Sequence, residues 1–83
     1  MYQVLIEKQA QKQLEKIPEP QYSRVKKAIL NLGINPRPQG YKKLKGRPGY
    51  RIRQGDYRII YLVKDKILQV LILEAGNRKD IYD

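Results

Sequence analysis

The chain has 83 residues, and its 18 lysines and arginines against 8 acidic residues give a formal net charge of +10. A chain this short buries little apolar surface, so we expect one domain over residues 1–83 with one small core. The absence of cysteine and histidine excludes a disulfide framework and leaves the common zinc and thiolate sites without ligands. The large positive charge favours a polyanionic partner, and we expect no metal or other cofactor.

The apolar segments are short. The apolar start Met1–Ile6 ends at Glu7 and Lys8, too early for the core of a signal peptide. The longest apolar stretch, Ile67–Leu73, includes Gln69 and has the length of a strand, not of a membrane span. The sequence therefore predicts a soluble, cytoplasmic protein without a membrane partner.

The first half of the chain predicts a strand and two helices. Residues 2–6 are β-prone and predict the strand. Apolar residues then recur at helical spacing in two stripes, Ala10, Leu14 and Ile17, followed by Tyr22, Val25, Ile29 and Leu32. Pro18 ends the first helix, Pro20 suits the first turn of the second, and Gly33 suits its C-terminal cap. We expect an αα-hairpin with one shared apolar side.

The second half predicts a loop followed by three strands. The breaker cluster 35–40 opens a basic loop that we expect to stay irregular until Tyr50. Strands are predicted at 50–54, 57–63 and 67–74, with a turn at 64–66 and a tail from 75 hinged at Gly76. The predicted fold is α+β: an N-terminal strand, an αα-hairpin, then an antiparallel three-strand meander that completes a small twisted sheet packed on the helices.

Positive charge is concentrated in residues 41–58. This segment has seven basic residues and one acid, Asp56, so its net charge is seven minus one, or +6. The basic residues are Lys42, Lys43, Lys45, Arg47, Arg51, Arg53 and Arg58. Scattered surface lysines are commonly just solvated, but concentration in one segment favours a phosphate-binding site.

The hairpin around Gly55 and Asp56 gathers arginines on one face. Glycine at the first central position suits a type II′ turn, which places Arg53 opposite Arg58 and puts Arg51 on the same face. Tyr50, Ile52, Ile59 and Tyr61 fall on the other face, where they can pack on the helices. Like charges directly opposite each other destabilise a sheet, so the pair predicts a bound anion.

The alternative is that these arginines extend into water or pair with Glu74 and Asp80. Spacing favours the functional interpretation, since arginine donates two hydrogen bonds to phosphate and stays charged at physiological pH. The tail adds Arg78 and Tyr82 as candidates, because an aromatic ring beside guanidinium groups can hold an unstacked base. Terminal residues are, however, more often frayed than functional.

The arrangement of strand, two helices, basic loop, "LKGRPGYRIRQGDYRIIY", apolar strand and "GNRKDIY" resembles the RelE/ParE superfamily of bacterial toxins from toxin–antitoxin pairs. The resemblance covers essentially the whole chain. It implies a RelE-like fold and a cognate antitoxin that wraps the toxin, in a hetero-oligomer. For members similar to RelE it implies a metal-independent, ribosome-dependent mRNA endonuclease that inhibits translation. The substrate 2′-hydroxyl attacks the adjacent phosphate to give a 2′,3′-cyclic phosphate.

The resemblance also assigns site residues by position. The second-strand basic residues fall on Arg51 and Arg53, and the third-strand arginine on Arg58. In the tail, the arginine near the phosphate matches Arg78, and the aromatic residue that orients the base matches Tyr82. The resemblance thus implies a catalytic set, with further basic residues, Lys42, Lys43, Lys45, Arg47 and Lys79, as contacts to ribosomal RNA.

Two departures affect the mechanism. Arginines replace the second-strand lysines of RelE-like enzymes, and Asn77 stands where many relatives carry histidine. Neither arginine nor asparagine readily exchanges a proton near neutral pH. The proton acceptor is open between Glu74, Tyr82, Lys45 and a ribosomal group.

Three functions therefore compete. The first is the mRNA endonuclease, and the second is a ParE-like inhibitor of DNA gyrase that cuts nothing itself. The third is a non-catalytic RNA-binding module, which rests on charge alone. We expect the antitoxin to cover the arginine face or to displace the tail.

Overall fold

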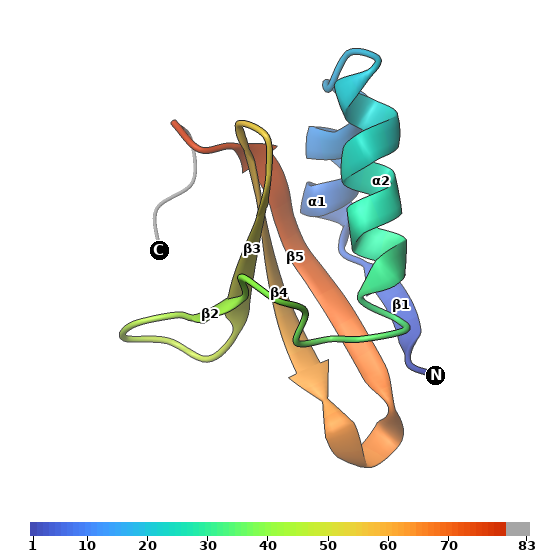
Figure 1. Cartoon of the computed structure of the whole chain (residues 1–83), viewed down its shortest axis with the longest axis vertical. Helices are drawn as coiled ribbons and strands as arrows, with labels where there is room; N and C mark the ends of the chain where they lie inside the picture. The colour runs from blue at the N-terminus through green and yellow to red at the C-terminus, as the bar shows by residue number, and fades with distance from the viewer. Residues whose placement is uncertain (80–83) are drawn as a thin grey trace.

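The computed structural model describes residues 1–79 and contains two α-helices beside one five-stranded sheet (Figure 1). The elements in chain order are β1 (Gln3–Ile6), α1 (Lys8–Glu15), α2 (Gln21–Asn31), β2 (Lys42–Lys43), β3 (Tyr50–Gln54), β4 (Tyr57–Lys64), the 3-10 helix η1 (Asp65–Ile67) and β5 (Gln69–Asn77). Neither helix is long and apolar enough to cross a membrane, within the residues that the structure describes.

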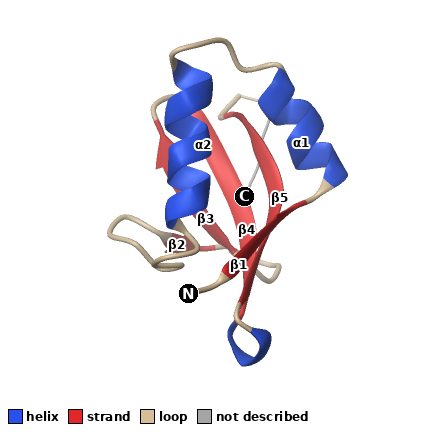
Figure 2. Cartoon of the chain, turned by 90° about the vertical axis from the view of Figure 1, so that its right-hand side faces the viewer, coloured by secondary structure: helices blue, strands red, loops and turns tan. Residues whose placement is uncertain are grey.

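The strand order in the sheet is β1-β5-β4-β3-β2. β1 runs parallel to β5, whereas the other neighbours are antiparallel. A parallel pair cannot be closed by a tight turn, and here the chain between the two strands includes both helices, which lie on one face of the sheet (Figure 2). The predicted α+β architecture with its antiparallel meander is confirmed.

The core lies between the helices and this face. The helical stripes predicted from spacing supply Ala10, Leu14, Ile17, Val25, Ile29 and Leu32, and the strands supply Ile52, Ile59, Tyr61, Val70, Ile72 and Ala75. Gly33 directly follows Leu32, the C-cap residue of α2, as the predicted C-terminal glycine should, but it is not among the glycines with positive φ. A Cβ at Gly33 would lie 2.9 Å from the Tyr2 carbonyl oxygen, so the residue is small to let β1 approach.

One strand was not predicted, and the last strand has other bounds than predicted. The loop expected to be irregular forms β2, because buried Leu44 packs with Ile60 and donates its N–H to the Gly49 carbonyl, which holds the preceding lysines beside β3. β5 begins at Gln69, after η1, and continues through Gly76 to Asn77. Gly76 pairs with Arg58, so it is part of the sheet and not a hinge.

A network centred on Arg37 fixes the loop between α2 and β2. Its guanidinium lies 3.0 Å from an Asp65 carboxylate oxygen and 5.2 Å from the centre of the Tyr50 ring, and it donates to the Tyr50 hydroxyl. The Tyr2 hydroxyl donates to the same carboxylate at 2.6 Å. Tyr61, fully buried, donates its hydroxyl to the Pro36 carbonyl at 2.7 Å. The loop is thus tied to the start of β1, to β3 and to η1.

Asp65 makes the network sensitive to acid. The hydrogen bonds from Arg37 and then Tyr2 lower the pKa of Asp65 from 3.8 to about 2. A lowered pKa stabilises the fold above the ordinary value, and that stabilisation is lost as the pH falls through the folded value. We expect Asp65→Asn to have a lower melting temperature than the parent at pH 6 and a similar one near pH 2. Asp56→Asn, in the exposed hairpin turn, is the control; a difference of equal size at both pH values would contradict this role for Asp65.

Candidate nucleic-acid interface

The β3–β4 hairpin has the predicted register. Gln54 pairs with Tyr57, Arg53 with Arg58, Ile52 with Ile59 and Arg51 with Ile60. Gly55 has φ +61°, and Asp56 is not among the residues with positive φ, as a type II′ turn requires. The turn therefore determines which side chains share a face.

The arginines of the hairpin differ in burial. Arg51 is 9% exposed, Arg58 is half-buried and Arg53 is exposed. In a two-residue hairpin the closing pair is hydrogen-bonded, so the next pair, Arg53 with Arg58, is a non-hydrogen-bonded one with Cα atoms about 4.5 Å apart. Two cations this close repel each other, and an anion bound between their guanidinium groups would relieve that repulsion.

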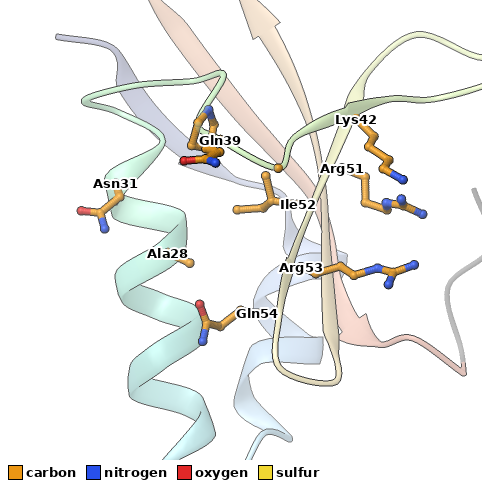
Figure 3. Close-up of a pocket in the computed structure, with 10 residues that line it drawn as sticks. Ala28, Asn31, Gln39, Lys42, Arg51, Ile52, Arg53 and Gln54 are labelled. Atoms are coloured by element: carbon orange, nitrogen blue, oxygen red, sulfur yellow. The ribbon is translucent and has the colours of Figure 1, made fainter.

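β2 extends the positive surface. Lys42 pairs with Arg51, and the side chains of Lys42, Arg51 and Arg53 lie on the side of β3 away from α2 (Figure 3). Lys43 and Lys45 are exposed nearby in the chain. We refer to the five residues Lys42, Arg51, Arg53, Arg58 and Lys43 as the cationic edge of the sheet. All five lie on the β3–β4 hairpin and its short neighbour β2, so their placement depends on the Gly55 turn and on the anchoring of Leu44.

Arg47 and Glu74 form an ion pair. The Arg47 guanidinium lies 3.3 Å from a Glu74 carboxylate oxygen, and both side chains are partly exposed. Glu74 therefore pairs with the loop arginine, not with an arginine of the hairpin face. Asp80, the other acid considered as a partner for that face, lies outside the described residues.

The residues after β5 are described as far as Lys79. The Arg78 N–H donates to the Asp56 carbonyl at 2.8 Å, which ties this segment to the hairpin turn. The side-chain oxygen of Asn77 accepts the Lys79 N–H. Arg78 and Lys79 are exposed. Tyr82 falls outside the described residues, so its proposed place beside the arginines stays a prediction.

A groove beside β3 was not predicted from the sequence. It has a volume of about 360 Å³ and is lined by α2, by the loop before β2, by Lys42 of β2 and by residues 51–54 of β3, so Arg51 and Arg53 also border it. Ile52 and Gln54 point into it toward α2, and Gln39 lies at one end (Figure 3). Alternation along β3 places these two side chains opposite the arginines, but the approach of α2 depends on tertiary packing. Within residues 1–79 no three His, Cys, Asp or Glu side chains gather as a metal-binding group.

Comparison with known proteins places the chain in a family. Residues 4–82 match the family model described as the ParE toxin of the type II toxin–antitoxin system, parDE. A comparison with curated proteins gives no match.

Solved structures agree with the family match. The RelE–RelB complex of Pyrococcus horikoshii OT3 contains a chain with 35% identity and a TM-score of 0.82, covering 96% of this chain and 98% of that one. The RelBE2 toxin–antitoxin complex of Mycobacterium tuberculosis has 26% identity and a TM-score of 0.82, covering 93% and 98%. The intact RelBE complex of E. coli has 26% identity and a TM-score of 0.79, covering 93% and 96%.

The fold and these matches define a toxin of a type II toxin–antitoxin system. The chain belongs to the ParE toxin family, within the RelE/ParE superfamily.

Proposed function

We propose that this toxin is a ribosome-dependent mRNA endonuclease. The observation that carries the proposal is the cationic edge, where Arg51, Arg53 and Arg58 share one face of a hairpin and Arg53 lies directly opposite Arg58. Guanidinium groups so placed suit a phosphate that gains negative charge during in-line attack. The resemblance to RelE complexes in three organisms supports the same function.

The reaction forms no covalent bond between the protein and its substrate. The substrate 2′-oxygen forms a bond to the adjacent phosphorus while the bond from phosphorus to the 5′-oxygen breaks, and a proton passes to the departing oxygen. The products are a 2′,3′-cyclic phosphate and a 5′-hydroxyl. Arg51, Arg53, Arg58 and Arg78 stabilise the phosphate, and Tyr82 orients the base. Alignment of the 2′-hydroxyl and stabilisation of the charge on the phosphate each lower the barrier of such reactions by roughly several kcal/mol. Together they account for much of the rate.

The proton acceptor is a separate question. Arginine stays protonated, so the hairpin cations do not take the 2′-proton. Lys45, Tyr82, Glu74 and a ribosomal group are the alternatives. Glu74 is already engaged in the ion pair with Arg47, whose guanidinium lies 3.3 Å from one of its carboxylate oxygens. Lys42, Lys43, Lys45, Arg47 and Lys79 contact ribosomal RNA in this proposal.

The second candidate is inhibition of DNA gyrase without RNA cleavage. The family match to ParE toxins favours it, as do Asn77 and Arg53, which cannot exchange a proton near neutral pH. Primer extension on mRNA after brief expression separates the two functions. The nuclease gives cuts within codons in the reading frame. Intact mRNA together with inhibited supercoiling by purified gyrase would instead establish the second function.

A cognate antitoxin is the protein partner of this toxin class, since the similar solved structures are toxin–antitoxin complexes. A partner of opposite charge would associate at an electrostatically steered rate with a +10 protein. We propose that the antitoxin covers the face of Arg51, Arg53 and Arg58 or displaces the tail. Hydrogen exchange of the complex tests this, and a complex that leaves both regions as accessible as in the free toxin would contradict it.

A further inference from the structure

We propose that the groove between α2 and β3 holds one unstacked nucleobase of the RNA whose phosphate binds the cationic edge, and that Gln54 reads that base. The inference rests on the proposed RNA function and adds to it the site at which the protein would prefer one RNA base over another. In this proposal the strand crosses the outer edge of β3, with its phosphate on one side of the strand and its base on the other.

The groove has the size and chemistry of a small-ligand site. Its volume of about 360 Å³ lies at the lower end of the range for such sites, roughly 300–1,000 Å³. Ala28 and Ile52 give it apolar walls, and Gln39 and Gln54 give it amide groups. No acidic side chain is among its lining residues in the described chain, so nothing there repels RNA. Amides carry both a donor and an acceptor, as the edges of bases do.

The backbone of β3 adds a second set of base-reading groups. The hydrogen-bonded pairs of the hairpin are Gln54 with Tyr57 and Ile52 with Ile59, so the N–H and C=O of Arg53 point away from β4. In the described structure β2 pairs only with Tyr50 and Arg51 and ends before it reaches Arg53. These two backbone groups therefore face the groove from the open edge of the sheet.

In this proposal the phosphate and the base contact opposite sides of β3. Arg53 and Lys42 point away from α2, whereas Gln54 and Ile52 point toward it (Figure 3). Adjacent residues of a strand alternate in this way, so a phosphate on Arg53 and a base beside Gln54 are less than one nucleotide apart along β3. Contacts to phosphate give affinity without sequence information, and contacts to base edges give preference. An extended protein segment could also pair with an open strand edge, but the amides of Gln39 and Gln54 in the groove match the donors and acceptors of base edges, which favours RNA.

The test measures binding of four RNA hexanucleotides, rA6, rC6, rG6 and rU6, by fluorescence anisotropy without ribosomes. We expect Gln54→Leu, which keeps the side chain's approximate size and removes its amide, to change the ratio between the tightest and weakest affinities by about fivefold or more. Arg53→Ala should weaken all four affinities by a similar factor. Gln3→Leu is the matched control, since Gln3 is exposed on β1, at the opposite edge of the sheet.

The possible outcomes separate the groove from the proposed function. Unchanged ratios in Gln54→Leu, with RNA binding intact, would overturn the base site and leave the RNA function standing. A uniform loss in Gln54→Leu would also overturn it. If the parent protein bound none of the four RNAs, the base site would be overturned, whereas the ribosome-dependent cleavage is decided separately by primer extension. A loss of antitoxin affinity in Gln54→Leu with unchanged RNA ratios would assign the groove to the protein partner and overturn the base site.

Discussion

Arg58→Ala should lower the rate of mRNA cleavage in a translation extract by about 100- to 1,000-fold, the usual cost of removing one group that stabilises developing charge. Arg58 lies on β4, paired with Arg53 of β3 on one side and with Gly76 of β5 on the other. Arg58 is half-buried in β4, whereas Arg53 is exposed, so the Arg58 guanidinium has less conformational freedom than that of Arg53. The loss should therefore appear in the rate of cleavage and not only in binding.

The control for this prediction is Lys64→Ala, which removes an exposed cation from the far end of the same strand. It should cleave at the parental rate. Primer extension gives the cleavage rate, and far-UV circular dichroism shows whether each variant is folded. Full cleavage by a folded Arg58→Ala protein would remove the nuclease mechanism as proposed. Loss of cleavage in both variants would show that total charge, and not the position of Arg58, matters.

Tyr61→Ala should lower the free energy of unfolding by about 3–5 kcal/mol. The Tyr61 side chain is 0% exposed and lies in the core between β4 and the helices. Truncation leaves a cavity and removes the hydrogen bond to the Pro36 carbonyl. Small domains have total stabilities at the low end of about 5–15 kcal/mol, so this variant should be largely unfolded at 37 °C.

Two further tyrosine variants separate the ring from the hydroxyl. Tyr61→Phe keeps the packing and loses only the hydrogen bond, so it should cost about 1–3 kcal/mol because a buried carbonyl is left without its donor. Tyr41→Ala is the control, since Tyr41 is 39% exposed and its ring packs on Tyr50, which in turn packs on Tyr61. Urea denaturation measures all three. A Tyr61→Ala protein as stable as Tyr41→Ala would contradict the central place of Tyr61 in the core.

The hairpin register could be predicted from the sequence because it depends on local chemistry. Glycine at the first turn position selects the turn, and the turn aligns Arg53 with Arg58. The two helices were predicted for a similar reason, since spacing alone defines their buried sides. Family resemblance then added the likeness to RelE toxins, which the solved structures confirm.

Features that depend on contacts distant in sequence were not predicted. β2 forms because Leu44 is buried against Ile60, sixteen positions away by residue number, and no local pattern encodes that burial. Arg37 meets Asp65 across the end of the molecule, and both residues lie in segments that look like ordinary loops. The groove at Gln54 requires α2 to approach the edge of β3, which is a result of packing.

The parallel pairing of β1 with β5 has a consequence for synthesis of the toxin. β1 has β5 as its neighbour in the sheet, and β5 is made only after the helices and all the other strands. During translation β1 therefore has no hydrogen-bonded neighbour in the sheet while more than sixty further residues are added to the chain. The five-stranded sheet is complete only once β5 has formed.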